Sequence, residues 1–201
     1  MTRQTIRTPG AARGVSDVTE ILRAASFAAV KHRDQRRKDA AATPYINHPL
    51  ELARVLSEEG GWVDKATLCA ALLHDTVEDT ATTLDELRAA FGLEVASIVA
   101  EVTDDKALPK AERKRQQIEH AATISEKAKL VKLADKICNL RDVANSPPSG
   151  WDLRRRQEYF DWAKEVIDRL RGVNHGLEAV FDRAYEGRPA DGSEVFTSTS
   201  S

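Results

Sequence analysis

Two histidines and two aspartates are the residues of this sequence best suited to chemistry. They are His48, the adjacent pair His74 and Asp75, and Asp135. The pair follows the apolar run 68–73, which predicts a helix enclosed by the rest of the domain. An ionised aspartate at the end of such a helix is costly to bury unless a partner or a cation offsets its charge. The four side chains therefore predict a site for one divalent metal ion.

The types of donor atom limit which ion such a site can hold. Imidazole nitrogen and carboxylate oxygen, without a thiolate, suit Mn, Fe, Ni or Zn in a site with open positions for water and substrate. A structural zinc site is not expected, because Cys69 and Cys138 lie far apart and lack any paired-cysteine spacing. A catalytic ion of this kind lowers the pKa of water and polarises a phosphoryl oxygen. Phosphate ester hydrolysis requires both actions.

Two further carboxylates stand one helical turn beyond the histidine–aspartate pair. Glu78 follows His74 by four residues, and Asp79 follows Asp75 by four. If one helix runs through all four residues, their side chains share one face. Taken singly, each of these residues is more often a structural or surface group than part of a site. Their coincidence predicts that Glu78 and Asp79 act on a water molecule beside the metal.

The elements that must bring these residues together are predicted to be helices throughout. Apolar residues recur at helical spacing, and no alternation or hairpin turn indicates a strand. The predicted helices span residues 18–31, 48–59, 65–79, 84–91, 93–103, 110–120, 126–146, 153–170 and 176–185. The expected N-terminal caps are Asp17, Asn47, Asp64, Thr83 and Ser125, and Gly92 is expected at a helix C-terminus. The sequence therefore predicts an all-α protein.

Length and composition favour a single domain. The chain has 201 residues, of which 41% are hydrophobic, enough for one substantial core. We predict a compact single domain over residues 16–186, with a disordered leader (1–15) and a disordered, Ser- and Thr-rich tail (187–201). No apolar run approaches the roughly 20 residues of a membrane span, and the N-terminus lacks a secretion signal. A cytoplasmic location without a membrane partner is therefore expected.

The charge balance argues against a nucleic-acid partner. The 30 basic and 32 acidic side chains leave a formal net charge of −2. Basic residues nevertheless gather in two segments, 31–38 and 106–115. Each segment is either a solvated surface or a binding surface for anions, and its charge alone does not distinguish the two. Nothing in the sequence indicates the oligomeric state.

Five ordered motifs resemble a known family. The segments HRDQRRKD, TPYINHP, ALLHDTVEDT, EVTDDK and LVKLADKICNLRD are similar to the HD-domain hydrolases of the SpoT and Rel type, within residues 16–185. The resemblance is closest to their small stand-alone class, which includes the metazoan SpoT homologue. It implies a compact all-helical HD-domain fold and one Mn²⁺ per chain. It also implies hydrolysis of the alarmones guanosine tetra- and pentaphosphate, (p)ppGpp, to GDP or GTP and pyrophosphate, without the synthetase domain of the long members.

The resemblance implies roles for individual residues. It implies that the metal ion is bound by the four residues named above from their donor atoms, His48, His74, Asp75 and Asp135. Positioning or deprotonation of the attacking water falls to Glu78 and Asp79. Contacts with the nucleotide fall to Arg37, Lys38 and Asn139, and contacts with phosphate or ribose are extended to Lys106, Arg141 and Tyr159.

Two other functions stay open at this point. One is removal of the 2′ phosphate of NADPH, because NADPH, like the alarmone, presents a ribose phosphate beside a purine and a diphosphate. The other is a sensor that binds the alarmone without cleaving it. The presence of both Glu78 and Asp79 argues against the sensor, since a protein that only binds needs no group to activate water.

Overall fold

The computed structural model describes residues 16–190, and these residues form helices joined by loops. Between them the only β-type pairing is an isolated bridge from Arg36 to Pro44. The all-α prediction is therefore confirmed. The predicted leader and the tail beyond residue 190 lie outside the described residues. No helix in the described range is long and apolar enough to cross a membrane.

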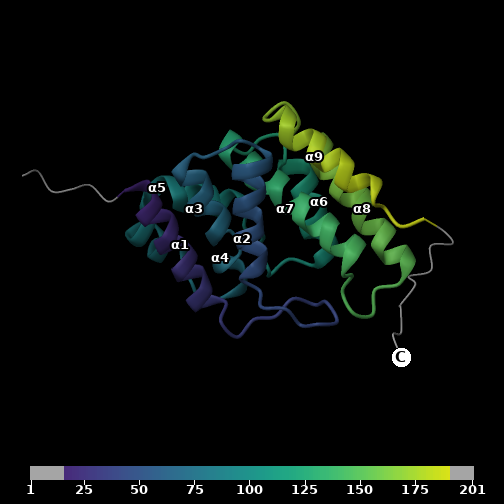
Figure 1. Ribbon diagram of the computed structural model, residues 1–201, viewed down its shortest axis with the longest axis horizontal. Coiled ribbons are helices and arrows are strands. Elements are labelled where there is room, and N and C mark those ends of the chain that lie inside the picture. Colours follow the sequence, from purple (N-terminus) through teal and green to yellow (C-terminus); the bar gives the residue numbers. More distant parts are fainter. Residues whose placement is uncertain (1–15, 191–201) are drawn as a thin grey trace, which may run out of the picture.

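The elements follow one another as Figure 1 labels them. They are α1 (Asp17–Lys31), α2 (Asn47–Arg54), a π-helical turn η1 (Val55–Glu59), α3 (Lys65–Leu73), α4 (Thr76–Asp79), α5 (Leu84–Val102), α6 (Lys110–His120), α7 (Glu126–Asn145), α8 (Leu153–Asp168) and α9 (His175–Glu186).

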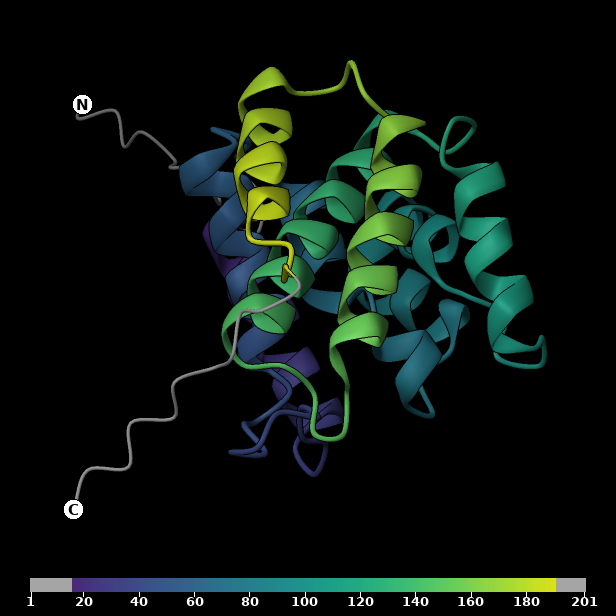
Figure 2. The same cartoon turned by 90° about the vertical axis from the view of Figure 1, so that its right-hand side faces the viewer.

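Two helices form the centre of the molecule. Every residue from 66 to 73 in α3 is buried, because α1, α2, α5 and α7 pack around this helix (Figure 1). Helix α7 packs against α2, α3, α5, α8 and α9 (Figure 2). Its side chains Leu133, Ile137 and Leu140 are fully buried. Burial of one such side chain contributes about 1.5–3 kcal/mol relative to exposure. Helix α3 ends next to His74, and α7 contains Asp135. The helices that position these predicted ligands thus form the core.

Local signals set several helix starts as predicted. Asp64, Thr83 and Ser125 have extended backbones, and each side chain accepts a hydrogen bond from the backbone N–H three residues further on. Such a cap satisfies a donor that has no partner inside the helix, and replacing it by alanine typically costs about 1 kcal/mol. Three caps that position α3, α5 and α7 are therefore confirmed.

Two predicted caps are wrong. Ser16, rather than Asp17, caps α1, because its hydroxyl accepts the N–H of Thr19 at 3.2 Å. Asp17 occupies the first turn instead, where the helix dipole stabilises its negative charge. Asn47 begins α2 without capping it, since Ile46 before it already has helical φ and ψ of −56° and −23°. The chain enters this helix through a turn, not through a side-chain cap.

The predicted helix over residues 65–79 is interrupted. Helix α3 ends at Leu73, and α4 begins at Thr76. The hydroxyl of Thr76 donates to the carbonyl of Leu73 at 2.7 Å, and Nδ1 of His74 donates to the carbonyl of Ala71 at 2.8 Å. Side chains thereby satisfy carbonyls that backbone N–H groups would bond in a continuous helix. The predicted histidine–aspartate pair lies in the turn that results.

The π-helical turn η1 after α2 was not predicted. The N–H of Gly60 bonds to the carbonyl of Val55, five residues earlier, at 3.0 Å. A Cβ at Gly60 would lie 2.7 Å from Cγ of Leu177 in α9. Only glycine lets the end of this turn approach α9 so closely.

Gly92 interrupts α5 with φ of 88° and ψ of 169°, a conformation that is essentially restricted to glycine. A Cβ at this position would meet no atom within 4 Å, so the restriction comes from the backbone alone. The predicted end of a helix at Gly92 is confirmed.

We expect Gly92→Ala to lower the free energy of unfolding by about 1–3 kcal/mol, because alanine must adopt the same strained backbone. Urea denaturation measures this change. Ser97→Ala is the matched control: Ser97 is exposed in the same element, and its replacement should change stability by less than about 0.5 kcal/mol. Equal stability of Gly92→Ala and wild type would contradict the conformation described.

Candidate active site

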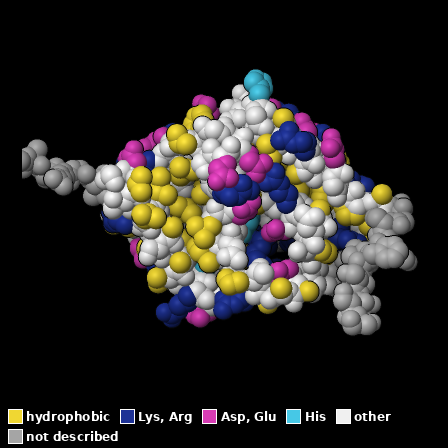
Figure 3. Space-filling model, viewed as in Figure 1, with side chains coloured by type: hydrophobic (Ala, Val, Ile, Leu, Met, Phe, Trp, Pro, Cys, Tyr) yellow, Lys and Arg dark blue, Asp and Glu magenta, His cyan; other side chains and the backbone are white. Residues whose placement is uncertain are grey.

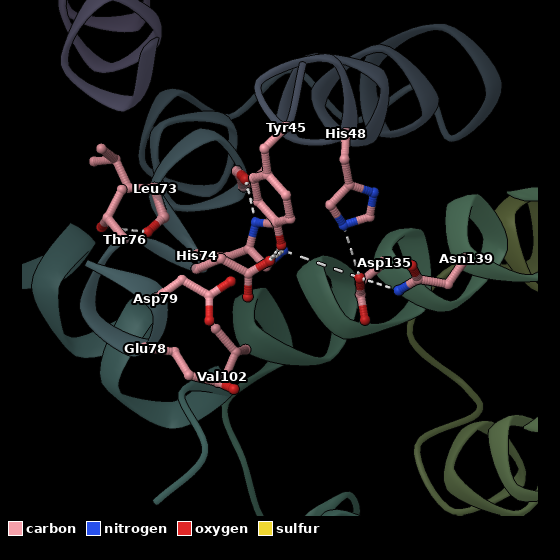
Figure 4. A network of polar contacts seen from close by, with 12 residues as sticks. Tyr45, His48, Leu73, His74, Thr76, Glu78, Asp79, Val102, Asp135 and Asn139 are labelled. Atoms are coloured by element: carbon pink, nitrogen blue, oxygen red, sulfur yellow. Dashed lines mark hydrogen bonds and ion pairs between the residues drawn. The ribbon is translucent and has the colours of Figure 1, made fainter. Parts of the chain in front are cut away.

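Three of the predicted ligands come together from three elements. His48 lies in the first turn of α2, His74 follows α3, and Asp135 lies in α7 (Figure 4). His48 Nε2 is 3.2 Å from Asp135 Oδ1, and His74 Nε2 is 4.0 Å from the same oxygen. One ligand atom from each residue lies within 4.8 Å of the others. Among residues 16–190 this is the one group of three or more possible ligands that are so close together. The three atoms can therefore share one ion.

The protonation of His74 fits a metal ligand. Its Nδ1 donates to the carbonyl of Ala71, so Nε2 is the ring nitrogen that can bind a cation once it has lost its proton. Nε2 is buried without a hydrogen bond in the described structure, although Asp75 Oδ2 lies 2.8 Å away. Burial lowers the pKa of His74, but the charges of Asp75 and Asp135 more than offset burial and raise it to about 9. The site attracts positive charge, and its donor set fits a divalent cation.

Asp75 is held differently from the other three. Its Oδ2 accepts the hydroxyl of Tyr45 and faces His74 Nε2, and it lies outside the group of mutually close ligand atoms. Burial raises the pKa of Asp75, but the imidazoles of His74 and His48 hold it well below its usual range. Burial and the charge of Asp75 raise the pKa of Tyr45, so its hydroxyl stays a donor. Metal binding by Asp75 itself stays a prediction.

Glu78 and Asp79 lie in the short helix α4, close to the ligands (Figure 4). Glu78 Oε2 accepts the N–H of Asp104 at 3.2 Å, and its Oε1 is 3.6 Å from Arg113 Nη1. Burial, followed by the charge of Asp75, raises the pKa of Glu78 to about 6. A carboxylate with such a pKa is ionised at neutral pH and is still a useful proton acceptor.

Asp79 has other partners than Glu78. Its Oδ2 accepts from Gln35 Nε2 at 2.8 Å, and its Oδ1 pairs with the ammonium of Lys106. Gln35 is fixed in turn by His32, whose Nδ1 lies 2.6 Å from Gln35 Oε1. The two carboxylates of α4 are therefore distinct: one is half-buried with a raised pKa, and the other is paired with a cation.

A cleft of about 860 Å³ adjoins these groups, and Figure 3 shows the hollow with charged side chains around it. Its size suits a nucleotide-sized ligand. The predicted site residues that line it are His48, Glu78, Asp79, Arg37, Lys38, Lys106, Asn139 and Tyr159.

Arg37 links the basic loop before α2 to the ligand helix. Its Nη2 donates to Asn139 Oδ1 at 3.1 Å and pairs with Asp142. Asn139 Nδ2 donates to Asp135 Oδ1 at 2.6 Å. A continuous chain of hydrogen bonds thus runs from the guanidinium of Arg37 to the carboxylate of Asp135.

Arg141 lies apart from the other predicted contacts with the substrate. Its two terminal nitrogens each bond to Glu59 at 2.8 Å, and Arg141 is absent from the residues that line the cleft. It follows Asn139 by two residues, and two residues turn a helix by about 200°, so the side chains point in nearly opposite directions. The contact between Arg141 and phosphate or ribose stays a prediction, and the pairing of Arg141 with Glu59 outside the cleft does not support it.

Several residues of the site escaped the sequence analysis. They are Gln35 and Tyr45 in the loop before α2, Arg113 in α6, and Lys136 and Asp142 in α7. The loop residues stand inside the motifs that carried the family resemblance, and this was the one available signal. The basic segment 106–115 contains both kinds of residue that the sequence allowed. Arg113 lines the cleft, whereas Arg115 pairs with Glu112 and Glu119 at the solvated surface.

Comparison with known proteins decides the family. A model of the HD domain matches residues 24–161. The chain belongs to the HD-domain family. It is 61% identical over 170 residues to the guanosine-3′,5′-bis(diphosphate) 3′-pyrophosphohydrolase MESH1 of Xenopus tropicalis, which covers 85% of this chain and 95% of the relative. The protein of the same name from Homo sapiens is 56% identical over 173 residues, covering 86% and 97%.

Solved structures give the same result. A structure described as a metazoan ortholog of SpoT that hydrolyzes ppGpp matches with a TM-score of 0.82 and 47% identity, covering 91% of this chain and 98% of that chain. Among the relatives found by sequence, the GTP pyrophosphokinase rsh of Brucella melitensis is 41% identical over 135 residues, but only 18% of its length is matched. The resemblance to the small class of SpoT-type HD-domain proteins is therefore confirmed.

We expect Asp135→Asn to abolish Mn²⁺ binding, because Asp135 supplies the oxygen that faces both imidazoles. Glu78→Gln should bind Mn²⁺ nearly as well as wild type, since its carboxylate contacts Asp104 and Arg113 instead. Calorimetric titration of metal-free protein measures both affinities, with Asp182→Asn in α9 as a control that removes a distant carboxylate. Equal loss of metal in the Asp135 and Glu78 variants would disprove this division of roles.

Proposed function

We propose that this HD-domain protein hydrolyses guanosine 3′,5′-bis(diphosphate) and its pentaphosphate analogue, releasing the 3′ pyrophosphate and leaving GDP or GTP. The observation that carries the proposal is the group formed by His48, His74 and Asp135, with Glu78 and basic side chains lining the same cleft. The names and the high identity of the relatives support the same substrate.

We infer that one Mn²⁺ occupies the group of three ligands. Imidazole and carboxylate donors without thiolate suit this ion. When bound, a divalent ion supplies charge that lowers the pKa of water and polarises a phosphoryl oxygen. Asp75 is then either a fourth ligand or the group that orients His74, and its contact with Tyr45 fits both roles.

The residues of the chain supply the proton transfer and hold the substrate. Water attacks the phosphorus attached to the ribose 3′ oxygen, and the bond between phosphorus and that oxygen breaks. The 3′ oxygen leaves and takes up a proton to become the 3′ hydroxyl of GDP or GTP, and the diphosphate group is released as pyrophosphate. Glu78 accepts the proton of the water, since its pKa of about 6 leaves it ionised at neutral pH. Asp79, held by Gln35 and Lys106, forms the neighbouring wall of the cleft.

The basic residues of the cleft bind the phosphates. Lys38, Lys106 and Arg113 line it and offer N–H donors to phosphate oxygens. Arg37 lies over the Tyr45 ring, with its guanidinium carbon 5.7 Å from the ring centre, and bonds to Asn139. Arg37 and Asn139 are therefore suited to contact the base and ribose, and Tyr159 closes the cleft at α8.

A second cavity favours NADPH 2′-phosphatase activity as the alternative. It measures about 640 Å³ and shares Lys38, Arg113, Trp151 and Tyr159 with the first. Basic and aromatic side chains continue along its walls, which suits a ligand longer than a mononucleotide. The raised pKa of Glu78 favours either reaction over a sensor that binds without cleavage.

Parallel assays with Mn²⁺ test the substrate. We expect kcat/KM for pyrophosphate release from the alarmone to exceed that for phosphate release from NADPH by about tenfold or more, which corresponds to about 1.4 kcal/mol of transition-state binding. A preference for NADPH would replace the main proposal by the alternative. Tight alarmone binding without turnover at any divalent metal would instead indicate a sensor.

Glu78→Gln should lower kcat for the alarmone by about 10²–10⁴-fold, the usual contribution of a positioned general base, with little change in KM. Arg141→Gln is the control, because Arg141 bonds to Glu59 outside the cleft and should leave kcat/KM within a few-fold of wild type. Steady-state kinetics measures both. A large increase in KM for Arg141→Gln would restore it as a substrate contact.

A further inference from the structure

Lys136 is a buried lysine that the proposed reaction does not use. It follows Asp135 in α7, and its side chain is 5% exposed. Its ammonium nitrogen lies 3.0 Å from Asp135 Oδ2, which is its one hydrogen-bond acceptor within residues 16–190. The ion pair with this carboxylate keeps the buried ammonium charged. The side chain is therefore a buried cation with an incomplete set of hydrogen bonds.

An aromatic ring covers this cation. Lys136 Nζ lies 4.6 Å from the centre of the Trp162 ring in α8, well within the range of a cation–π contact. The indole N–H of Trp162 donates to the carbonyl of Lys114 at 3.2 Å, which fixes the orientation of the ring. The ammonium of Lys114 also lies 4.6 Å from the ring centre. Trp162 therefore contacts cations from both α6 and α7.

The two oxygens of Asp135 have separate partners as a result. Oδ1 accepts from Asn139 at 2.6 Å and faces His48 Nε2 at 3.2 Å. Oδ2 bonds to Lys136. A carboxylate held in this way offers one oxygen to the ligand group, while the other is engaged on the far side by a buried positive charge.

We propose that Trp162 is a positioning residue for the metal ligand Asp135 and that it acts through Lys136. The ring keeps the ammonium against Oδ2, so that Asp135 binds the divalent ion through Oδ1 alone. Groups that orient a metal ligand in this way typically change metal affinity by about 10–100-fold when they are removed. The inference rests on the metal centre of the proposed function, but it concerns binding of the ion and not turnover.

Calorimetric titration of the metal-free full-length protein with Mn²⁺, without nucleotide, tests the role of Trp162. We expect Trp162→Leu to weaken Mn²⁺ binding by about tenfold or more, and Trp162→Phe, which keeps an aromatic face, to stay within a few-fold of wild type. Trp162→Met should resemble Trp162→Leu, and it provides the test if the leucine variant does not fold. The matched control is Trp151→Leu, since Trp151 contacts Arg155 and Tyr159 but not Lys136, and its metal affinity should not change.

A double-mutant cycle then tests whether Trp162 acts through Lys136. In a Lys136→Met background, Trp162→Leu should change Mn²⁺ affinity no further, whatever Lys136→Met does alone. Wild-type affinity in folded Trp162→Leu or Trp162→Met, or an equal loss in both backgrounds, would overturn the inference while leaving the proposed function intact. A wild-type protein that binds no Mn²⁺ would overturn both.

Discussion

Burial of the Asp135 carboxylate is the constraint around which the centre of this structure is organised. An ionised carboxylate inside a helical core is tolerated only if charges and hydrogen bonds replace its water, and removing one partner of such a group typically costs about 3–5 kcal/mol. Here His48 comes from α2, His74 follows α3, and Asn139 and Lys136 come from α7 itself. Burial raises the pKa of Asp135, but Lys136 and the imidazoles hold it well below its usual range. The site is therefore assembled by the same packing that brings α2 and α3 against α7.

The same constraint explains the interruption after α3. Residues 66–73 are enclosed on all sides. If α3 continued without interruption, residues 74–79 would extend along the same axis. The side chains of His74 and Thr76 instead bond to the carbonyls of Ala71 and Leu73. The turn directs the imidazole toward α7, and it lets α4 place Glu78 and Asp79 along the cleft.

Local patterns made much of this fold predictable. The caps at Thr83 and Ser125 and the break at Gly92 depend on neighbouring residues in the chain, and all three are confirmed. The proximity of His48, His74 and Asp135 is also confirmed. The signal was strongest at His74, because a histidine–aspartate pair that follows the buried run 66–73 has few alternatives to a shared ion. The interruption after α3 was not predictable, since it depends on side chains bonding to backbone carbonyls rather than on hydrophobic spacing.

Contacts between distant segments were the other limit. Helical spacing already turns Arg141 away from Asn139, but its pairing with Glu59 follows from the orientation of α7 relative to η1, and no local pattern encodes that contact. Gln35 and Tyr45 lie in a loop without hydrophobic period, and they become part of the site only because α4 and the end of α3 lie opposite. Sequence reasoning therefore found the groups whose chemistry is unusual for their surroundings. It missed the groups whose role comes from their neighbours.

The two oxygens of the Asp135 carboxylate lead to two different cavities. From Oδ1 the hydrogen bonds run through Asn139 to Arg37 in the loop before α2. From Oδ2 the contact runs through Lys136 to Trp162, which lines the second cavity. Each path ends at a side chain that lines a cavity, and each begins at the same carboxylate. Arg37 and Trp162 are therefore each two side-chain contacts from Asp135, so the proposed metal centre is connected to the walls of both cavities.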